Sequence, residues 1–286
     1  MSNIVEAKSL RKNYGSFTAL DGVDLTIPRG AISGLIGPNG AGKTTTLKAL
    51  IGLCDVDGEL SVAGRDPRVA RHKLMEDVCF IADVGILPKW LKVSQLVDYV
   101  EAVHPRFDRK KAEKFLSTTD IPANKRIKEL SKGMVTQLHL ALVMAIEVQL
   151  LVLDEPTIGL DIIYRKEFYD RLLNDFFDGN RTIIISTHQV EEIETLLSHL
   201  VFINKGKIVL DSLMSDLPGI YTEVLVDVDR VAQADALQPI HVRESLGKKS
   251  YIFEAVPREL LEVLGELQTP SVADLFVAKL KGEKHG

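Results

Sequence analysis

The chain is short of several residue types, and each shortage excludes a class of protein. Of its 286 residues only Cys54 and Cys79 are cysteines, too few for a disulfide framework and too far apart for a local metal motif. We expect both to be reduced packing residues. Basic residues do not predominate, since 35 Lys and Arg face 40 Asp and Glu for a net charge of −5. This balance gives no electrostatic footprint for nucleic acid, and we expect no nucleic-acid partner.

Long hydrophobic runs are also missing. The most apolar region, Leu138 to Leu153, is interrupted by His139, Glu147 and Gln149, so it indicates a buried helix and strand rather than a membrane span. The N-terminus lacks a charged start followed by an apolar stretch, which predicts no signal peptide and a cytoplasmic protein. Hydrophobic residues at 45% and 11 prolines describe an ordinary globular chain of one large or two unequal domains.

What stands out is a glycine-rich turn between an apolar segment (31–36) and a helix-like segment (45–53). Its spacing, G-x-x-x-x-G-K-[ST], predicts a phosphate cradle, because glycines tolerate the backbone angles that point successive amides at one anion. The following helix adds its positive end. Lys43 would reach the β- and γ-phosphates, and the Thr44 hydroxyl would ligate Mg²⁺. The turn consists of Gly37, Pro38, Asn39, Gly40, Ala41, Gly42, Lys43 and Thr44.

Hydrophobic periodicity predicts an α/β fold around this turn. Alternating patterns favour an antiparallel pair of strands at the N-terminus, and continuous apolar runs favour parallel strands buried on both faces. The predicted strands are 4–10, 17–27, 58–64, 78–82, 150–153 and 182–186. The predicted helices are 93–103, 109–118, 135–146, 162–177 and 190–197, and a mostly helical insertion spans about 83–146.

The pattern changes from Asp211 onward. Strands are predicted at 223–228 and 251–256, and a helix at 272–280 that Thr269-Pro270-Ser271 would start. Gly-Lys pairs near Lys205 and Lys248 indicate hairpin turns. We therefore expect a main domain over 1–211 and a small α+β domain over 212–286.

Two carboxylates and a histidine are predicted at one edge of the parallel sheet. Asp154 and Glu155 end a buried strand, where open α/β sheets place ligands. Asp154 would hold Mg²⁺ and Glu155 would polarise the water that attacks the γ-phosphate; the alternative is a solvated pair that caps the next helix. His188 follows the strand 182–186 and would donate to a γ-phosphate oxygen, unless it is a structural histidine.

Two further positions are candidates for nucleotide contact. Ser131, in Leu130-Ser131-Lys132-Gly133-Met134, precedes a long helix whose free N–H groups would bind an anion, and a plain N-cap is the alternative. Tyr14 lies in a turn, where it would stack on a purine or simply pack.

Together, and in this order, these motifs resemble the nucleotide-binding subunit of ATP-binding cassette (ABC) transporters over about residues 3–211. The resemblance implies a P-loop NTPase core, that is, a RecA-like parallel sheet with an antiparallel β subdomain and a helical insertion. The roles implied are adenine stacking for Tyr14, phosphate binding for 39–45 including Thr45, metal contact for Asp154, the general base for Glu155 and the switch histidine for His188.

The resemblance also implies partners. Ser131 and Gly133 match positions that contact the γ-phosphate held by an opposite subunit, and Asp161, in Gly159-Leu160-Asp161, lies in a loop that crosses the dimer. We therefore expect a head-to-tail dimer of this chain with ATP and Mg²⁺ at its interface. It would act on the cytoplasmic face of the membrane and power a separate integral membrane permease. The rivals are a soluble ABC-type ATPase acting on DNA, ribosomes or regulatory proteins, and a binding module with little turnover.

Three positions depart from the family pattern. Asp83 stands where a glutamine is usual, Lys132 where glycine is common and Met134 where glutamine is common. These substitutions and the C-terminal segment Thr269 to Phe276 resemble the sequences of the subgroup that serves small exporter-type permeases. The segment Val84 to Trp90 is our candidate docking surface, although Trp90 is equally compatible with a core position.

Overall fold

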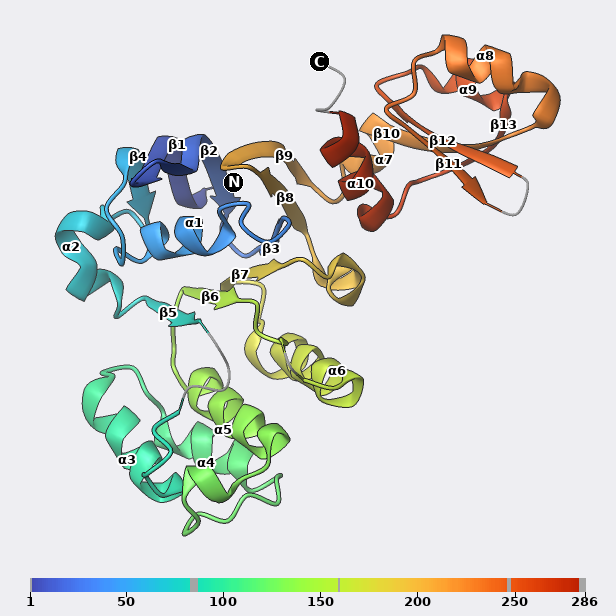
Figure 1. The fold of residues 1–286 in the computed structure, drawn as a ribbon. Helices are drawn as coiled ribbons and strands as arrows, with labels where there is room; N and C mark the ends of the chain where they lie inside the picture. The colour runs from blue at the N-terminus through green and yellow to red at the C-terminus, as the bar shows by residue number, and fades with distance from the viewer. Residues whose placement is uncertain (1, 83–86, 159, 246–247, 283–286) are drawn as a thin grey trace.

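The main sheet has six strands in the order β5-β6-β7-β3-β8-β9 (Figure 1). The structure, a computed structural model, describes residues 2–82, 87–158, 160–245 and 248–282. All neighbouring strands are parallel except β9, which pairs antiparallel with β8. The strands are β3 (Ile32–Ile36), β5 (Val78–Ile81), β6 (Leu150–Asp154), β7 (Thr182–Thr187), β8 (His199–Asn204) and β9 (Lys207–Leu213). The predicted α/β fold with buried parallel strands is therefore confirmed.

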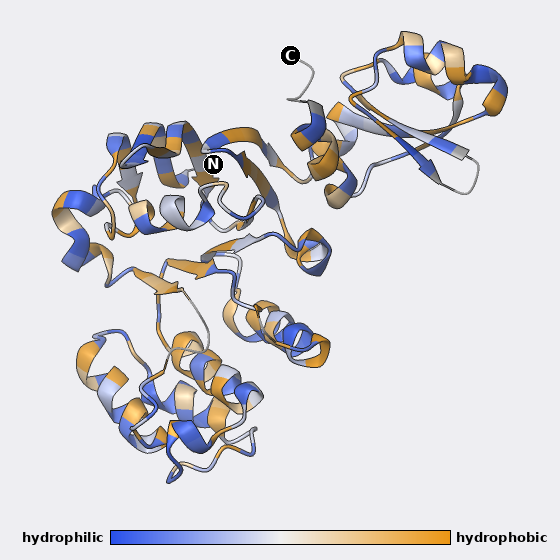
Figure 2. Ribbon diagram, in the orientation of Figure 1, coloured by the Kyte–Doolittle hydropathy of each residue, from blue (hydrophilic) through white to orange (hydrophobic). Residues whose placement is uncertain are grey.

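Both faces of this sheet are covered, which explains why its strands are almost wholly apolar. Leu151 and Leu153 of β6 point toward α5 (Lys132–Met144) and α6 (Ile162–Arg171). Leu150 and Val152 point to the opposite side, toward α1 (Lys43–Leu50) and a three-stranded antiparallel sheet. Figure 2 shows the apolar colouring concentrated in the central strands. The antiparallel sheet consists of β2 (Phe17–Pro28), β1 (Asn3–Tyr14) and β4 (Asp57–Val62).

The helical segment between β5 and β6 has a hydrophobic core of its own. It contains α3 (Val93–Val103), α4 (Arg109–Leu116), a 3₁₀ turn η1 (Ile127–Glu129) and α5 (Figure 1), and side chains such as Leu96, Ile121 and Leu138 are buried together there. The helix α2 (Pro67–Leu74), which the periodicity did not predict, precedes β5. Its Asp66 cap, whose carboxylate accepts the Arg68 N–H at 2.9 Å, was the signal in the sequence.

One predicted helix is wrong. Residues 190–197 form two 3₁₀ turns, η3 (Val190–Glu192) and η4 (Glu194–Leu196). The buried side chains Val190 and Ile193 are three residues apart, which matches the three residues per turn of a 3₁₀ helix. The predicted helix 162–177 also changes character, because α6 ends at Arg171 and a π-helical turn η2 (Leu172–Phe176) follows.

The C-terminal segment adds a four-stranded antiparallel sheet in the order β11-β12-β10-β13. Its elements are α7 (Leu217–Ile220), β10 (Tyr221–Val226), η5 (Val228–Arg230), α8 (Val231–Ala236), β11 (His241–Ser245), β12 (Lys248–Glu254), α9 (Arg258–Glu262), β13 (Gly265–Gln268) and α10 (Val272–Gly282). Helix α10 returns to the main core, where Phe276 meets Phe202 with ring centroids 5.0 Å apart. Among the helices of the described ranges, none is long and apolar enough to cross a membrane.

Candidate functional site

The ends of three neighbouring strands bring the predicted site residues together. Strand β3 lies between β7 and β8, and β7 lies between β3 and β6. The glycine-rich turn follows β3, Glu155 follows β6, and His188 follows β7. Because these strands are parallel, their carboxyl ends meet at one edge of the sheet, where α/β proteins bind ligands.

The backbone of the turn requires glycine at specific places. Gly40 and Gly42 have φ angles of 80° and 112°, in the region that favours glycine. A Cβ atom on Gly42 would lie 2.7 Å from the carbonyl oxygen of Ala19, and one on Gly37 would lie 2.4 Å from that of Ile203. The turn borders a cavity of about 230 Å³. Its lining consists of Phe17, Ala19, Asn39, Gly40, Ala41, Gly42, Lys43, Thr44, Thr45, Glu155 and Ile158.

Lys43, Glu155 and His188 form a cluster at this cavity. The Lys43 Nζ lies 3.1 Å from the Glu155 Oε1 and donates to the carbonyl oxygen of Gly37 at 2.7 Å. The His188 Nδ1 lies 3.0 Å from the Glu155 Oε2. Only 6% of Lys43 is exposed, and carbonyl and carboxylate oxygens hold its ammonium group beside the cavity. A phosphate oxygen would compete with the carboxylate for the same ammonium group.

The two carboxylates at the end of β6 have different surroundings. Asp154 is buried, and its Oδ1 accepts the Ser186 hydroxyl at 2.6 Å. Glu155 has a φ of 50°, which is uncommon for a residue with a side chain. Its N–H donates to the Ser186 carbonyl and hydroxyl oxygens, at 3.1 and 3.0 Å. Neighbouring β7 therefore holds the backbone turn that sends Asp154 into the sheet edge and Glu155 toward Lys43.

Of the two aromatic residues at the β1–β2 turn, Phe17 belongs to the lining of the cavity in the described part of the chain and Tyr14 does not. The two residues pair across the β1–β2 turn. At least half of each side chain is exposed, 50% of Tyr14 and 57% of Phe17. Phe17 lines the cavity, whereas Tyr14 lies beneath the Lys12 ammonium group, 5.3 Å from its ring centroid. The sequence analysis did not single out Phe17, which pairs with Tyr14 across the hairpin, and adenine stacking by Tyr14 stays a prediction.

Ser131 and Gly133 lie at the start of α5. The Ser131 Oγ accepts the Met134 N–H at 3.2 Å, so Ser131 is the N-cap of that helix. A Cβ atom on Gly133 would lie 2.3 Å from the ring of Tyr164, so glycine is required there for packing against α6. Neither residue belongs to the lining of the cavity around Lys43 in the described part of the chain.

Asp161 is the N-cap of α6. One turn further along the helix, Arg165 bonds to the segment that follows His188. The Asp161 Oδ1 accepts the N–H groups of Ile163 and Tyr164, at 3.0 and 3.1 Å. The Arg165 guanidinium donates to the carbonyl oxygen of Leu160 at 2.8 Å. It also donates to the Gln189 Oε1 at 2.8 Å and pairs with Glu192. Sequence reasoning missed this network, because nothing in the spacing of these residues shows that they meet.

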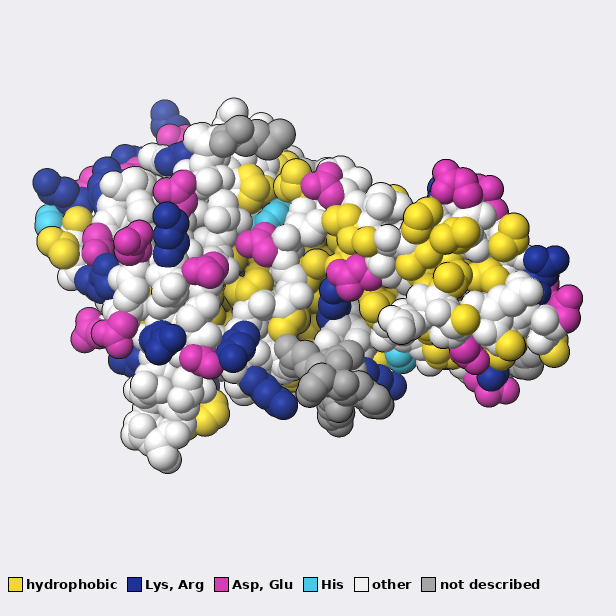
Figure 3. All heavy atoms as spheres, turned by 90° about the horizontal axis from the view of Figure 1, so that it is seen from above, with side chains coloured by type: hydrophobic (Ala, Val, Ile, Leu, Met, Phe, Trp, Pro, Cys, Tyr) yellow, Lys and Arg dark blue, Asp and Glu magenta, His cyan; other side chains and the backbone are white. Residues whose placement is uncertain are grey.

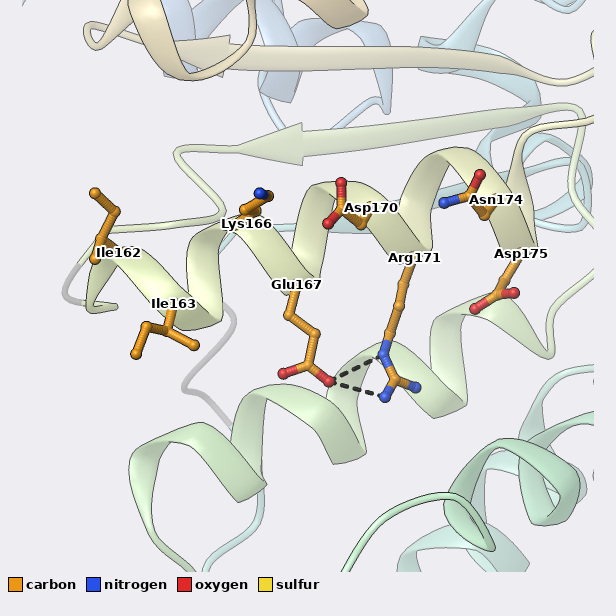
Figure 4. A pocket seen from close by; sticks show the side chains of 8 residues that line it. All are labelled: Ile162, Ile163, Lys166, Glu167, Asp170, Arg171, Asn174 and Asp175. Carbon is orange, nitrogen blue, oxygen red and sulfur yellow. Dashed lines mark hydrogen bonds and ion pairs between the residues drawn. The ribbon is translucent and has the colours of Figure 1, made fainter.

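A larger hollow, about 560 Å³, runs along the outer face of α6 away from this chemistry (Figure 4). Ile162 and Ile163 lie at its end by the first turn of α6, and the Glu167–Arg171 ion pair lies along it. Lys43 and Glu155 instead line the cavity of about 230 Å³ beside the glycine-rich turn, which is therefore the candidate site. Asp83 and Gly159 lie outside the described residues. Among the residues described, no group of three or more His, Cys, Asp or Glu is placed to hold a metal ion.

Comparison with known proteins connects this geometry to a family. The family described as ABC transporter matches residues 20–158. The Nod factor export ATP-binding protein I of Cupriavidus metallidurans is 30% identical over 92% of this chain and 90% of its own. The ABC transporter ATP-binding protein YtrB of Bacillus subtilis is 27% identical over 98% and 99%.

Solved structures agree at the level of the fold. A structure described as the ATP binding subunit of an ABC transporter has a TM-score of 0.67 at 23% identity, and it covers 76% of this chain and 92% of its own. CbiO1 of Clostridium perfringens, part of the complex cbiONQ, has a TM-score of 0.65 at 25% identity, over 77% and 92%. With its P-loop fold and these relatives, the chain belongs to the ABC transporter ATP-binding proteins and is an ATPase.

Proposed function

We propose that two copies of this chain hydrolyse ATP at composite sites between them and drive a separate membrane permease in the export direction. The observation that carries this proposal is the cluster of Lys43, Glu155 and His188 over the glycine-rich turn. These three side chains would supply a cation for phosphate, a carboxylate base and an imidazole. They lie beside Gly40 and Gly42, whose positive φ angles are suited to a turn that points backbone N–H groups at an anion.

These residues divide the chemistry among them. Lys43 would exchange the Glu155 carboxylate for the β- and γ-phosphates, which frees Glu155 to accept a proton from the attacking water. His188 would hold a γ-phosphate oxygen. The donor set of Thr44 and Asp154 fits Mg²⁺, which neutralises phosphate charge when bound. The Ser186 hydroxyl, 2.6 Å from the Asp154 Oδ1, fixes that carboxylate in place.

Two observations support the dimer. In the described part of the chain Ser131 and Gly133 lie outside the lining of the cavity around Lys43, so the contact with the γ-phosphate that the family resemblance implies for them would come from a second copy. Three isoleucines beside Asp161 are exposed, namely Ile158 at 59%, Ile162 at 82% and Ile163 at 74%. Exposed aliphatic side chains of this kind favour a protein surface as their cover.

The proposals of a permease partner and of transport in the export direction rest on the names of relatives. One relative is named for Nod factor export and another, from Streptomyces coeruleorubidus, for daunorubicin resistance. We propose that this chain likewise serves an exporter through the surface that ends at Trp90, although Val84 to Ile86 lie outside the described residues. Purification with a stoichiometric membrane protein would support this, whereas association with ribosomes or DNA would contradict it.

We also propose that the chain divides near residue 211. The C-terminal sheet has its own buried side chains, including Val224, Tyr251 and Phe253, while Val272 of α10 is buried in the main core. Hydrophobic side chains gather on the surface of this C-terminal lobe (Figure 3).

The decisive experiment for the site is Glu155→Gln. The amide cannot act as a base, so phosphate release should fall by about 10² or more, while ATP is retained and the dimer accumulates. Loss of the carboxylate that competes for Lys43 should also favour nucleotide binding. Light scattering with and without ATP would report the dimer. The exposed Glu191→Gln is the matched control, and wild-type turnover in Glu155→Gln would show that Glu155 is not the base.

A further inference from the structure

The two 3₁₀ turns that follow His188, η3 and η4, are enclosed between the main sheet and α10. On one side they lie against β3, because a Cβ atom on Gly34 of that strand would come within 2.7 Å of the Leu197 side chain that follows η4. On the other side they contact α10, whose Val272 and Leu275 are buried in the same hydrophobic core. The path of the chain after His188 is therefore set by α10 as well as by the sheet.

Glu194 makes a polar contact between these turns and α10. Its Oε1 accepts the N–H of Val272, the first residue of α10, at 2.9 Å. The N–H groups of a first helical turn have no partner within the helix, and the helix dipole favours a carboxylate beside them. Ser271 satisfies another of these groups, since its Oγ accepts the Asp274 N–H at 3.1 Å. Because Glu194 and Val272 are 78 residues apart, the bond joins the segment after His188 to the far end of the chain.

The opposite side of α10 is bound to the C-terminal sheet by charged side chains. Asp274 pairs with Arg243 of β11 at 2.8 Å, and Lys279 pairs with Glu254 of β12 at 2.7 Å. The hydrophobic cluster of that sheet lies instead on its α8 and α9 side. Figure 1 shows α10 between the main sheet and the C-terminal sheet. Helix α10 therefore has an apolar side in the main core and a charged side on the C-terminal lobe.

We propose that Glu194 is a positioning residue for His188 and that α10 connects the C-terminal lobe to the ATP site. By holding the 3₁₀ turns on α10, Glu194 fixes the backbone that follows β7, and with it the place of the His188 imidazole beside Glu155. An imidazole displaced by about 1 Å would lose its aligned contact with a γ-phosphate oxygen. The inference rests on the proposed function, because the place of His188 affects hydrolysis only if His188 contacts the nucleotide.

Turnover of the full chain with single substitutions tests the role of Glu194. Glu194→Ala should lower kcat about 10-fold at unchanged affinity for a fluorescent nucleotide, because His188 is displaced while the phosphate cradle is intact. Glu194→Gln keeps a side-chain oxygen that can accept the Val272 N–H, so it should restore kcat. Glu191→Ala removes a neighbouring exposed carboxylate and is the control, which should match wild type. Equal kcat values in Glu194→Ala and Glu191→Ala would overturn the proposal.

A double-mutant cycle shows whether Glu194 acts through His188. His188→Ala alone should lower kcat about 100-fold, as for the loss of one group that stabilises the transition state. Adding Glu194→Ala to His188→Ala should then cause no further loss, whereas a merely structural role would cost about 10-fold in both backgrounds. Wild-type kcat in His188→Ala would contradict the proposed function. A loss of kcat in His188→Ala without any loss in Glu194→Ala would contradict only the present inference.

Hydrogen exchange tests the connection in the opposite direction. Because coupling between two sites is reciprocal, ATP that engages His188 should stabilise the contact of η4 with α10. In Glu155→Gln, the amides of the first turn of α10, including that of Val272, should exchange about fivefold more slowly with ATP than without it. Exchange in α4 should not change, and adding His188→Ala should abolish the difference in α10. Equal exchange in α10 with and without ATP would overturn the connection between α10 and the ATP site.

Discussion

At the scale of single residues, Arg165 connects parts of the site that are far apart in sequence. Its guanidinium bonds the carbonyl oxygen of Leu160, next to Asp161, and the side chain of Gln189, next to His188. Replacing it leaves the cradle of Lys43 intact but removes the link between the two segments. We therefore interpret Arg165 as a positioning residue that keeps Asp161 and His188 in a fixed relation.

Arg165→Ala should lower kcat about 10- to 100-fold at nearly unchanged nucleotide affinity, since misplacement of about 1 Å costs rates of this order. Steady-state hydrolysis and binding of a fluorescent nucleotide would be measured together. Arg171→Ala is the control, because Arg171 is on the same helix, has an ion pair with Glu167 and is similarly exposed, at 22% against 26%. Equal losses of kcat in both variants would assign Arg165 a merely structural role.

At the scale of elements, Asp77 joins the helical insertion to the edge of the sheet. It directly precedes β5, and its carboxylate pairs with Arg65 and Arg106, each at 2.7 Å, and accepts the Gln149 amide at 3.1 Å. Burial opposes its charge, but these partners outweigh burial and lower the pKa of Asp77.

Asp77→Asn should reduce the free energy of unfolding by about 2 kcal/mol at neutral pH, as expected for hydrogen bonds to a charged group. Because the folded-state pKa is lowered, this stabilisation is present above the unfolded pKa of about 3.9 and is lost as pH falls through the folded value. Urea unfolding at pH 7 and below pH 4 would show the difference from wild type shrink in acid. Asp98→Asn, which removes an exposed pair with Arg109, should change stability by less than about 0.5 kcal/mol.

Elements with strong local signals could be predicted from the sequence, and those that depend on distant partners could not. The helix 93–103 and the turn at Lys205 were confirmed, the latter because Lys205 and Gly206 take the φ angles of 46° and 76° that a tight hairpin requires. The 3₁₀ turns after His188 were missed, because Glu192 is held by Arg165 and Glu194 accepts the N–H of Val272 at 2.9 Å. Such partners carry no local pattern.

The same limit applied to the site. The spacing of the glycine-rich turn and the strand before Glu155 predicted that both lie at the ligand-binding edge of the sheet. The ion pair of Lys43 with Glu155 there was not predicted. The contact of Tyr164 with Gly133 depends on how α5 and α6 pack, which periodicity does not determine.

At the scale of the whole molecule, the exposed isoleucines beside Asp161 make dimer formation testable apart from nucleotide binding. Ile162 and Ile163 project from the first turn of α6 (Figure 4), outside the cradle of Lys43. If a second copy covers them, Ile162→Ser with Ile163→Ser should leave ATP binding intact. It should weaken ATP-dependent dimers roughly 10-fold for each side chain, because about 1.4 kcal/mol of apolar burial is lost each time.

The measurement is light scattering over a range of protein concentrations in the Glu155→Gln background, with hydrolysis assayed in the wild-type background. Hydrolysis by the double-serine variant should rise with protein concentration, because mass action restores the dimer. Val69→Ser is the matched control, since Val69 is 83% exposed on α2, away from the site. Dimers of normal strength in the double-serine variant would place the interface elsewhere on the molecule, whereas loss of ATP binding would mean that these isoleucines support the fold of the site itself.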